Sequence, residues 1–272
     1  MPAWRKANLA GTRRPVEHGM VAVHHAATAS CLLFCFHHAG AGASIFRNWP
    51  RLLDPAIGVA TVQLPGRENA FGTPLLTDPE TAVERIGNEV ADHAHRPYAL
   101  FGHSLGAMLA FEVAAAIEAH NTRAPSCLIV SGHPPLQLKR EHATPASQLS
   151  DDEFVAMLRR YGGTPTEVLD NPDLQRLLLP IIRADFRLAE AHRLPEGRRV
   201  SCPILVLAGR EDATTNSSDL MRWGELTEAG TSVQMFDGGH FFIRSHERQV
   251  CETIGGFLRC HTMEGSHGIG AP

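Results

Sequence analysis

The chain has 272 residues, and its 25 Lys and Arg against 29 Asp and Glu give a formal net charge of −4. That length fits one large domain, or one domain with an insertion. The slight acidity is unlike the basic excess of a protein that tracks nucleic-acid phosphates. Hydrophobic residues make up 43% of the chain, which is enough for a sizeable core, and no apolar run approaches the roughly 18–20 residues of a membrane span. We therefore expect a globular protein that binds neither nucleic acid nor membrane.

Six cysteines and 16 histidines are the residues that could indicate a redox or metal site. The cysteines form no C-x-x-C pair, a distribution typical of buried free thiols in a reducing compartment, so we predict a cytoplasmic protein. The histidine pairs at 24–25 and 37–38 would point to opposite faces of a strand and could not converge on one ion. We therefore predict neither a metal site nor a bound cofactor.

Hydrophobic periodicity divides the chain into one domain and two ends. Residues 1–28 and 261–272 lack clear periodicity, so we expect a loosely ordered N-terminal arm, a flexible C-terminal tail and a single domain over residues 29–260. Short apolar runs typical of buried strands lie at Cys31–Phe36, Val59–Leu64, Tyr98–Phe101, Cys127–Ser131, Ile204–Ala208 and Val233–Phe236. Helical spacing is found at Pro79–His95, Leu105–His120, Ser217–Glu228 and His246–Arg259. Strands that alternate with helices predict an α/β fold with a mostly parallel central sheet flanked by helices.

One stretch, from about residue 134 to 196, contains no candidate strand. Ser150 and Glu153 have the spacing of a capping box that opens a helix, and Pro172–His192 gives a second long helical pattern. A helical insertion of this size predicts a lid over a site at the strand ends. The alternative is two extra helices that only pack against the sheet.

A Gly-x-Ser-x-Gly sequence occurs at residues 102–106, between an apolar run and an apolar helical pattern. A nucleophile elbow needs this strand–turn–helix setting, because the two glycines allow a strained turn that leaves the serine hydroxyl exposed at its tip. We therefore predict that Ser104 is a nucleophile. The alternative is a plain glycine-rich turn.

A serine nucleophile needs a base, and the base needs an acid that orients it. In folds with such an elbow the partners follow in the order serine, acid, histidine. His240 follows two glycines just after the run that ends at Phe236, and Asp212 follows the run that ends at Ala208. We predict Asp212 and His240 as the partners of Ser104. Glu211 and Asp237 stay as competing acids.

Two backbone N–H donors are needed for the oxyanion that forms when serine attacks a carbonyl. One is expected from Leu105, the residue after the nucleophile. The other is expected from the loop after the run that ends at Phe36, and we predict the Ala39 N–H. That loop, rich in glycine, lacks the Gly-Lys-Ser/Thr ending of a P-loop and the spacing of a dinucleotide fingerprint.

With these residues in place, the sequence resembles the type II thioesterases that accompany polyketide and non-ribosomal peptide synthetases, within the α/β-hydrolases. The resemblance extends from about residue 32 to 258. It is carried by Leu33–Gly40 with Trp49, Gln63–Glu68, Phe101–Ala107, Leu179–Phe186, Cys202–Ile204 with Gly209 and Asp212, and Gly238–Phe242. The interval from Asp212 to His240 also resembles the family arrangement and favours Asp212 over Asp237. One departure is His37, because the family usually has proline there; proline would fix φ and lacks an N–H.

The resemblance implies hydrolysis of acyl groups from the phosphopantetheine arm of acyl or peptidyl carrier proteins, through an acyl-enzyme on Ser104. The partner would then be a carrier protein, and the phosphopantetheine would belong to the substrate. Two alternatives stay open at this point. The same fold could serve a small-molecule esterase or an acyltransferase, or the chain could be a catalytically silent acyl-binding or scaffold protein.

Overall fold

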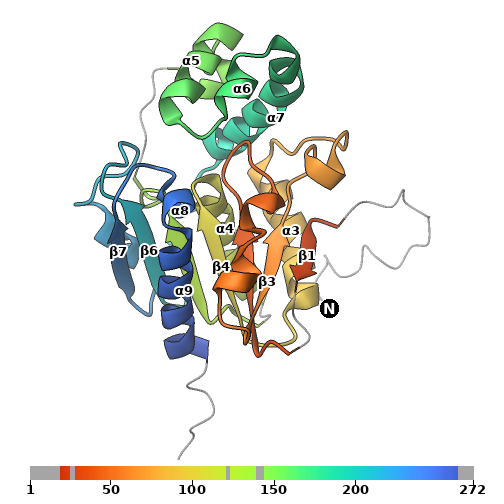
Figure 1. Ribbon diagram of the computed structural model, residues 1–272. Coiled ribbons are helices and arrows are strands. Elements are labelled where there is room, and N and C mark those ends of the chain that lie inside the picture. The colour runs from red at the N-terminus through yellow and green to blue at the C-terminus, as the bar shows by residue number, and fades with distance from the viewer. Residues whose placement is uncertain (1–18, 25–27, 121–122, 139–143, 263–272) are drawn as a thin grey trace, which may run out of the picture.

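The computed structural model describes residues 19–24, 28–120, 123–138 and 144–262. A seven-stranded sheet runs through the molecule in the order β1-β3-β2-β4-β5-β6-β7, and every neighbouring pair is parallel except β1 with β3 (Figure 1). The strands are β1 (Val21–His24), β2 (Cys31–Phe36), β3 (Ile57–Val62), β4 (Tyr98–His103), β5 (Cys127–Ser131), β6 (Ile204–Gly209) and β7 (Thr231–Phe236). The predicted α/β fold with a mostly parallel sheet is confirmed.

Strand β1 was not expected, because the arm predicted over residues 1–28 contained no element. It adds an antiparallel edge to β3, and its first residue donates a backbone hydrogen bond of 2.8 Å to the Glu89 carboxylate. Its four residues alternate between half-buried and exposed side chains. So short an edge strand gives almost no periodic signal. Residues 1–18 and 25–27 of the predicted arm, and 263–272 of the predicted tail, lie outside the described residues.

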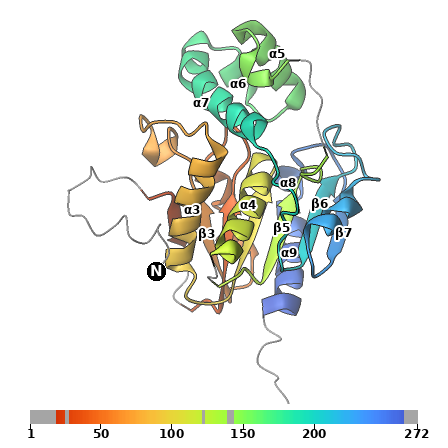
Figure 2. The same cartoon turned by 180° about the vertical axis from the view of Figure 1, so that it is seen from behind.

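Helices cover both faces of the sheet (Figures 1 and 2). Alternate residues of β2 enter two separate cores: Leu32, Phe34 and Phe36 on one side, Cys31, Leu33 and Cys35 on the other. The first core is closed by α3 (Pro79–His93) and α4 (Leu105–Ala119). The second is closed by α2 (Trp49–Leu52), α8 (Phe242–Ser245) and α9 (Glu247–Thr262). Burial on both faces explains why the parallel strands have continuous apolar runs.

Between β5 and β6 the described chain contains helices and no strand, as the sequence pattern predicts. The elements are η4 (Ala146–Gln148), α5 (Asp151–Tyr161), α6 (Thr166–Leu169) and α7 (Pro172–Ala191). Both hydrogen bonds of the capping box at Ser150 and Glu153 are present. These helices share a small core of their own and lie above the sheet in Figure 1. We refer to them below as the α5–α7 segment.

Two details differ from the expectations. The segment predicted as a helix over 217–228 forms a 3-10 helix, η5 (Leu220–Leu226), which is shorter than the predicted helix. Cys260 is exposed, whereas the other five thiols are buried as predicted. None of the six cysteines forms a disulfide bond in the described part of the chain. The structure also describes two short 3-10 helices, η2 (Ala43–Phe46) and η3 (Glu68–Ala70). In the described part of the chain, no helix has both the length and the apolar character that a membrane span requires.

Candidate active site

Ser104 lies at a strained turn between β4 and α4. Its φ of 55° and ψ of −119° are unusual for a residue with a side chain. The flanking glycines are required by space: a Cβ on Gly102 would lie 1.9 Å from the Gly106 oxygen, and one on Gly106 would lie 2.2 Å from the Phe36 oxygen. The elbow is anchored by a 2.8 Å hydrogen bond from Ser104 N–H to the Ser131 carbonyl. The chain therefore has the geometry that displays a serine hydroxyl at the end of a parallel sheet.

Asp212 and His240 meet after the last two strands of the sheet. His240 Nδ1 lies 2.8 Å from Asp212 Oδ2, and the Asp212 side chain is fully buried. The other carboxylate oxygen accepts from the Thr214 N–H at 2.8 Å and from its hydroxyl at 2.7 Å. Burial raises the pKa of Asp212, but the hydrogen bonds from His240 and Thr214 outweigh it and bring the pKa below its ordinary value. The carboxylate is thus held charged and aimed at the imidazole.

The competing acids do not reach His240. The side chain of Asp237 is 82% exposed and pairs with Arg210 at 3.1 Å, and Glu211 is exposed. No sequence pattern had singled out Thr214 as a partner of Asp212. An aspartate in a turn is the available signal, because its carboxylate can accept the backbone N–H two residues on.

His240 also lies beside the elbow. Its ring centroid is 5.0 Å from that of His103, and a Cβ on Gly132 would lie 3.4 Å from His240 Cε1. Ser104 Oγ makes no hydrogen bond to His240 among the described residues. Catalytic hydrogen bonds are commonly long in proteins without substrate. The three residues predicted from the sequence are therefore gathered at one end of the sheet.

The loop after β2 lies against the start of α4, so that the two predicted oxyanion donors belong to adjacent segments. Leu105 is the first residue of α4, where a helix leaves backbone N–H groups without an intrahelical partner. Close packing of Gly106 against the Phe36 and His37 carbonyls joins this helix end to the loop that carries Ala39. Among the described residues no acceptor takes the Ala39 N–H. The Ala39 and Leu105 N–H groups stay the predicted oxyanion donors.

Three buried histidines surround this end of the sheet: His37, His38 and His103. Burial lowers the pKa of His37 to about 3, with the Arg67 charge adding to the effect, and it lowers the pKa of His38 to about 3 as well. Burial also lowers the pKa of His103 far below its ordinary value. All three are thus neutral at physiological pH. We expected the 37–38 pair to point to opposite faces of a strand, but both residues follow β2 and lie in the loop.

These histidines predict a loss of stability in acid. The unfolded chain takes up protons near pH 6.5 that the folded protein excludes, so each histidine lowers the unfolding free energy by about 1.4 kcal/mol per pH unit below that point. Urea unfolding measured between about pH 7.5 and pH 5.5 should show this decline. Replacing His38 with glutamine should reduce the proton uptake on unfolding by one. A free energy of unfolding that stays constant or rises as the pH falls would contradict this prediction.

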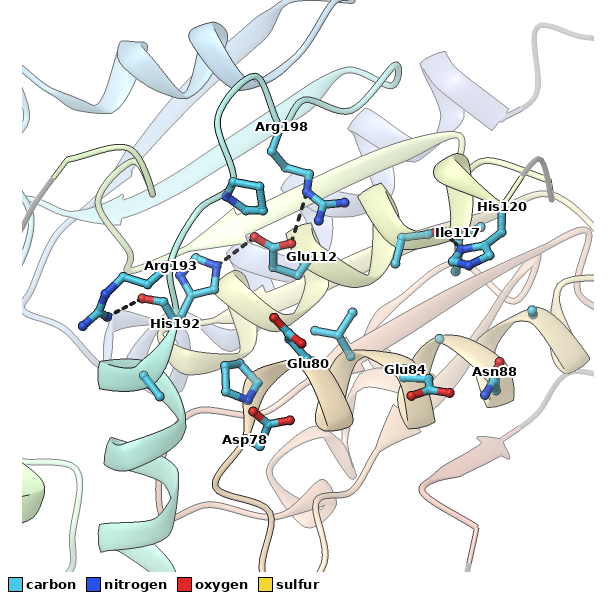
Figure 3. A pocket seen from close by; sticks show the side chains of 17 residues that line it. Asp78, Glu80, Glu84, Asn88, Glu112, Ile117, His120, His192, Arg193 and Arg198 are labelled. Carbon is cyan, nitrogen blue, oxygen red and sulfur yellow. Dashed lines mark hydrogen bonds and ion pairs between the residues drawn. The ribbon is translucent and has the colours of Figure 1, made fainter. Parts of the chain in front are cut away.

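A cavity of about 510 Å³ lies away from this centre, between α3, α4 and the chain that follows α7 (Figure 3). On its wall the buried Glu112 accepts from His192 at 2.8 Å and pairs with Arg198 at 3.7 Å. These contacts connect the end of α7 to α4. None of Ser104, Asp212 and His240 lines the cavity.

The sheet order and the serine elbow place the molecule among the α/β-hydrolases. Residues 32–258 match the thioesterase domain family. The chain belongs to that family, is a hydrolase of the thioesterase class, and its resemblance to type II thioesterases is confirmed.

Three similar proteins illustrate the relationship. "Linear gramicidin dehydrogenase LgrE" of Brevibacillus parabrevis is 34% identical over 247 residues, which cover 90% of this chain and 93% of LgrE. "Thioesterase PikA5" of Streptomyces venezuelae is 32% identical over 241 residues, which cover 86% of this chain and 83% of PikA5. The solved structure of the type II thioesterase BorB, from the borrelidin biosynthetic cluster, has a TM-score of 0.78 and 33% identity and covers 87% of this chain and 97% of its own. LgrE has the name of a dehydrogenase, but the loop after β2 in the present chain lacks the spacing of a dinucleotide fingerprint.

Proposed function

We propose that this protein hydrolyses thioesters that join acyl groups to the phosphopantetheine arm of carrier proteins in polyketide or non-ribosomal peptide synthesis. The observation that carries the proposal is the buried Asp212–His240 pair beside the strained Ser104, in a chain of the thioesterase family. The names of PikA5 and BorB support the substrate class, since the first is a thioesterase and the second belongs to the borrelidin biosynthetic cluster.

In the first half of the reaction Ser104 Oγ attacks the thioester carbonyl while His240 Nε2 takes its proton. Asp212 holds the imidazole with Nδ1 protonated, and its charge stabilises the imidazolium. The negative charge that develops on the carbonyl oxygen is stabilised by the Ala39 and Leu105 N–H groups. The carbon–sulfur bond then breaks, and His240 returns the proton to the departing thiol.

In the second half water attacks the acyl-serine. His240 takes a proton from the water, and the same two N–H groups stabilise the second tetrahedral intermediate. The carbon–oxygen bond to Ser104 breaks, the serine recovers its proton from His240, and the free acid leaves. The carrier thiol has already left when the acyl-enzyme formed, before water attacks.

The α5–α7 segment serves in this proposal as a lid over the acyl group. Its support is that Tyr161, the last residue of α5, lies with its ring centroid 6.1 Å from that of His240, and that Phe186 of α7 lies 6.3 Å from Tyr161. The segment also contacts helix α8, which follows His240 in the chain, because Arg244 of α8 donates to the Gly163 carbonyl at 3.3 Å. Tyr161, with Phe186 packed behind it, thus borders the reacting centre and would contact an acyl chain on Ser104.

The test compares hydrolysis of an acyl group on a carrier protein with hydrolysis of the same acyl group as a simple aryl ester. We expect kcat/KM to be higher for the carrier thioester. A strong preference for the aryl ester would overturn the carrier-protein assignment and favour a small-molecule esterase. Formation of a new ester or amide when an alcohol or amine is supplied, in place of free acid, would instead favour an acyltransferase.

A further inference from the structure

The peptide group that joins Ala39 to Gly40 is held at both ends. Its carbonyl accepts from His38 Nδ1 at 3.0 Å, which requires the proton to be on Nδ1. Its N–H donates to Asp185 Oδ2 at 2.7 Å. Two opposed hydrogen bonds fix the plane of this peptide. Because it adjoins the proposed oxyanion donor, the direction of the Ala39 N–H depends on it.

Among the described residues, the preceding peptide, which contains the Ala39 N–H itself, is held through its carbonyl alone. The His38 carbonyl accepts from His37 Nδ1 at 2.8 Å and from the Ala41 N–H at 3.1 Å. His37 Nε2 in turn accepts from the Leu64 N–H at 3.3 Å. The His37 side chain therefore ties the loop to the chain that follows β3.

Asp185 comes from α7 in the α5–α7 segment and is oriented by Arg67. The guanidinium donates to both carboxylate oxygens, at 2.6 and 2.8 Å, and the two side chains are only 7% and 1% exposed. Arg67 also donates to the Ala41 carbonyl at 3.0 Å. A buried ion pair gains little net stability, because desolvation offsets its attraction. Its clear structural effect here is to aim a carboxylate at the Gly40 N–H.

The same helix packs directly on the loop. A Cβ placed on Gly40 would lie 3.0 Å from Ile182 Cγ1, one helical turn before Asp185. The α5–α7 segment and the proposed oxyanion loop therefore share both an apolar contact and a charged hydrogen bond. Displacement of α7 would break both.

We propose that Asp185, oriented by Arg67, is a positioning residue that sets the direction of the Ala39 N–H, so that the oxyanion hole is complete only while α7 lies on the loop. This inference rests on the proposed acyl-enzyme mechanism. It does not depend on the identity of the physiological thioester.

The main test is the double variant Arg67→Met/Asp185→Leu. It removes both charges together, so no unpaired charge is left in the core, and it leaves the Gly40 N–H without its acceptor. With an aryl ester we expect kcat to fall on the order of 10- to 100-fold with KM within about twofold, less than the 10²–10³-fold cost of losing a whole oxyanion donor. The affinity for an acyl trifluoromethyl ketone, whose adduct on Ser104 has an oxyanion, should fall in parallel.

Two further variants separate positioning from folding. Asp185→Asn keeps the shape of the side chain and one carbonyl oxygen that can accept from the Gly40 N–H. The fall in kcat should therefore be smaller in this variant than in the double variant. Asp151→Asn is the matched control, because Asp151 pairs with Arg183 of the same helix α7 at 2.7 Å, away from the loop. Circular dichroism and melting temperature report on folding for all three.

Wild-type kcat and ketone affinity in a folded Asp185 variant would overturn the inference. It would also be overturned if Asp151→Asn caused the same fall in kcat, since the loss would then follow from disturbance of α7 alone. If the wild-type protein hydrolyses the aryl ester but not carrier thioesters, the proposed substrate is overturned. The role of Asp185 is still decided by the aryl ester and ketone measurements.

Discussion

Replacement of Ser104 with alanine is expected to lower kcat on the order of 10⁴–10⁶-fold while the protein stays folded. Without the hydroxyl no acyl-enzyme can form, and His240 has no serine proton to remove. The remaining rate would come from the backbone donors and from binding alone. Alanine is tolerated sterically, because it removes one atom and leaves the elbow backbone and its hydrogen bond to Ser131 in place.

The measurement pairs turnover with covalent labelling. Intact-mass analysis after treatment with a serine-directed phosphonate should show one adduct on the wild type and none on Ser104→Ala. The control is Ser218→Ala, an exposed serine in the chain between β6 and β7, which should be labelled and turn over like the wild type. Labelling of Ser104→Ala, or a kcat within about tenfold of the wild type, would contradict the assignment.

The parallel strands could be predicted from the sequence because both of their faces are buried. Cys31–Phe36 and Cys127–Ser131 have the predicted bounds, since each is a short, continuously apolar run. The run predicted at Val59–Leu64 begins earlier, at Ile57, because a glycine interrupts the apolar pattern there. Strand β1 has only one half-buried face and gave no such signal.

Part of the candidate site could also be predicted from the sequence, because a local motif and the order of residues along the chain indicate its members. The elbow at Ser104 has a sequence signature, and the order serine, acid, histidine pointed to Asp212 and His240. The link between Arg67 and Asp185 has no local signature, since the two residues are 118 positions apart. Only the fold brings α7 onto the loop after β2, and so the partner of the Gly40 N–H could not be derived from spacing.

The choice among the three acids leads to the second large effect. Asp212→Asn is expected to lower kcat on the order of 10³–10⁴-fold, as loss of the orienting carboxylate does in serine hydrolases. An amide can donate its NH₂ to Nδ1, which would leave the proton on Nε2, the nitrogen that must accept from Ser104. It would also supply no charge to stabilise the imidazolium. The side chain is nearly isosteric, and Thr214 can still donate to its oxygen.

Asp237→Asn is the matched control for this experiment, because Asp237 lies only three residues before His240 and was a competing candidate for the acid. Its side chain is 82% exposed and faces Arg210, so kcat should stay within about twofold of the wild type. Steady-state kinetics of both variants, with melting curves to confirm folding, decide between the two acids. A large loss in Asp237→Asn with normal turnover in Asp212→Asn would show that the acid of the triad is Asp237 and that the resting hydrogen bond from His240 to Asp212 is not the one used in catalysis.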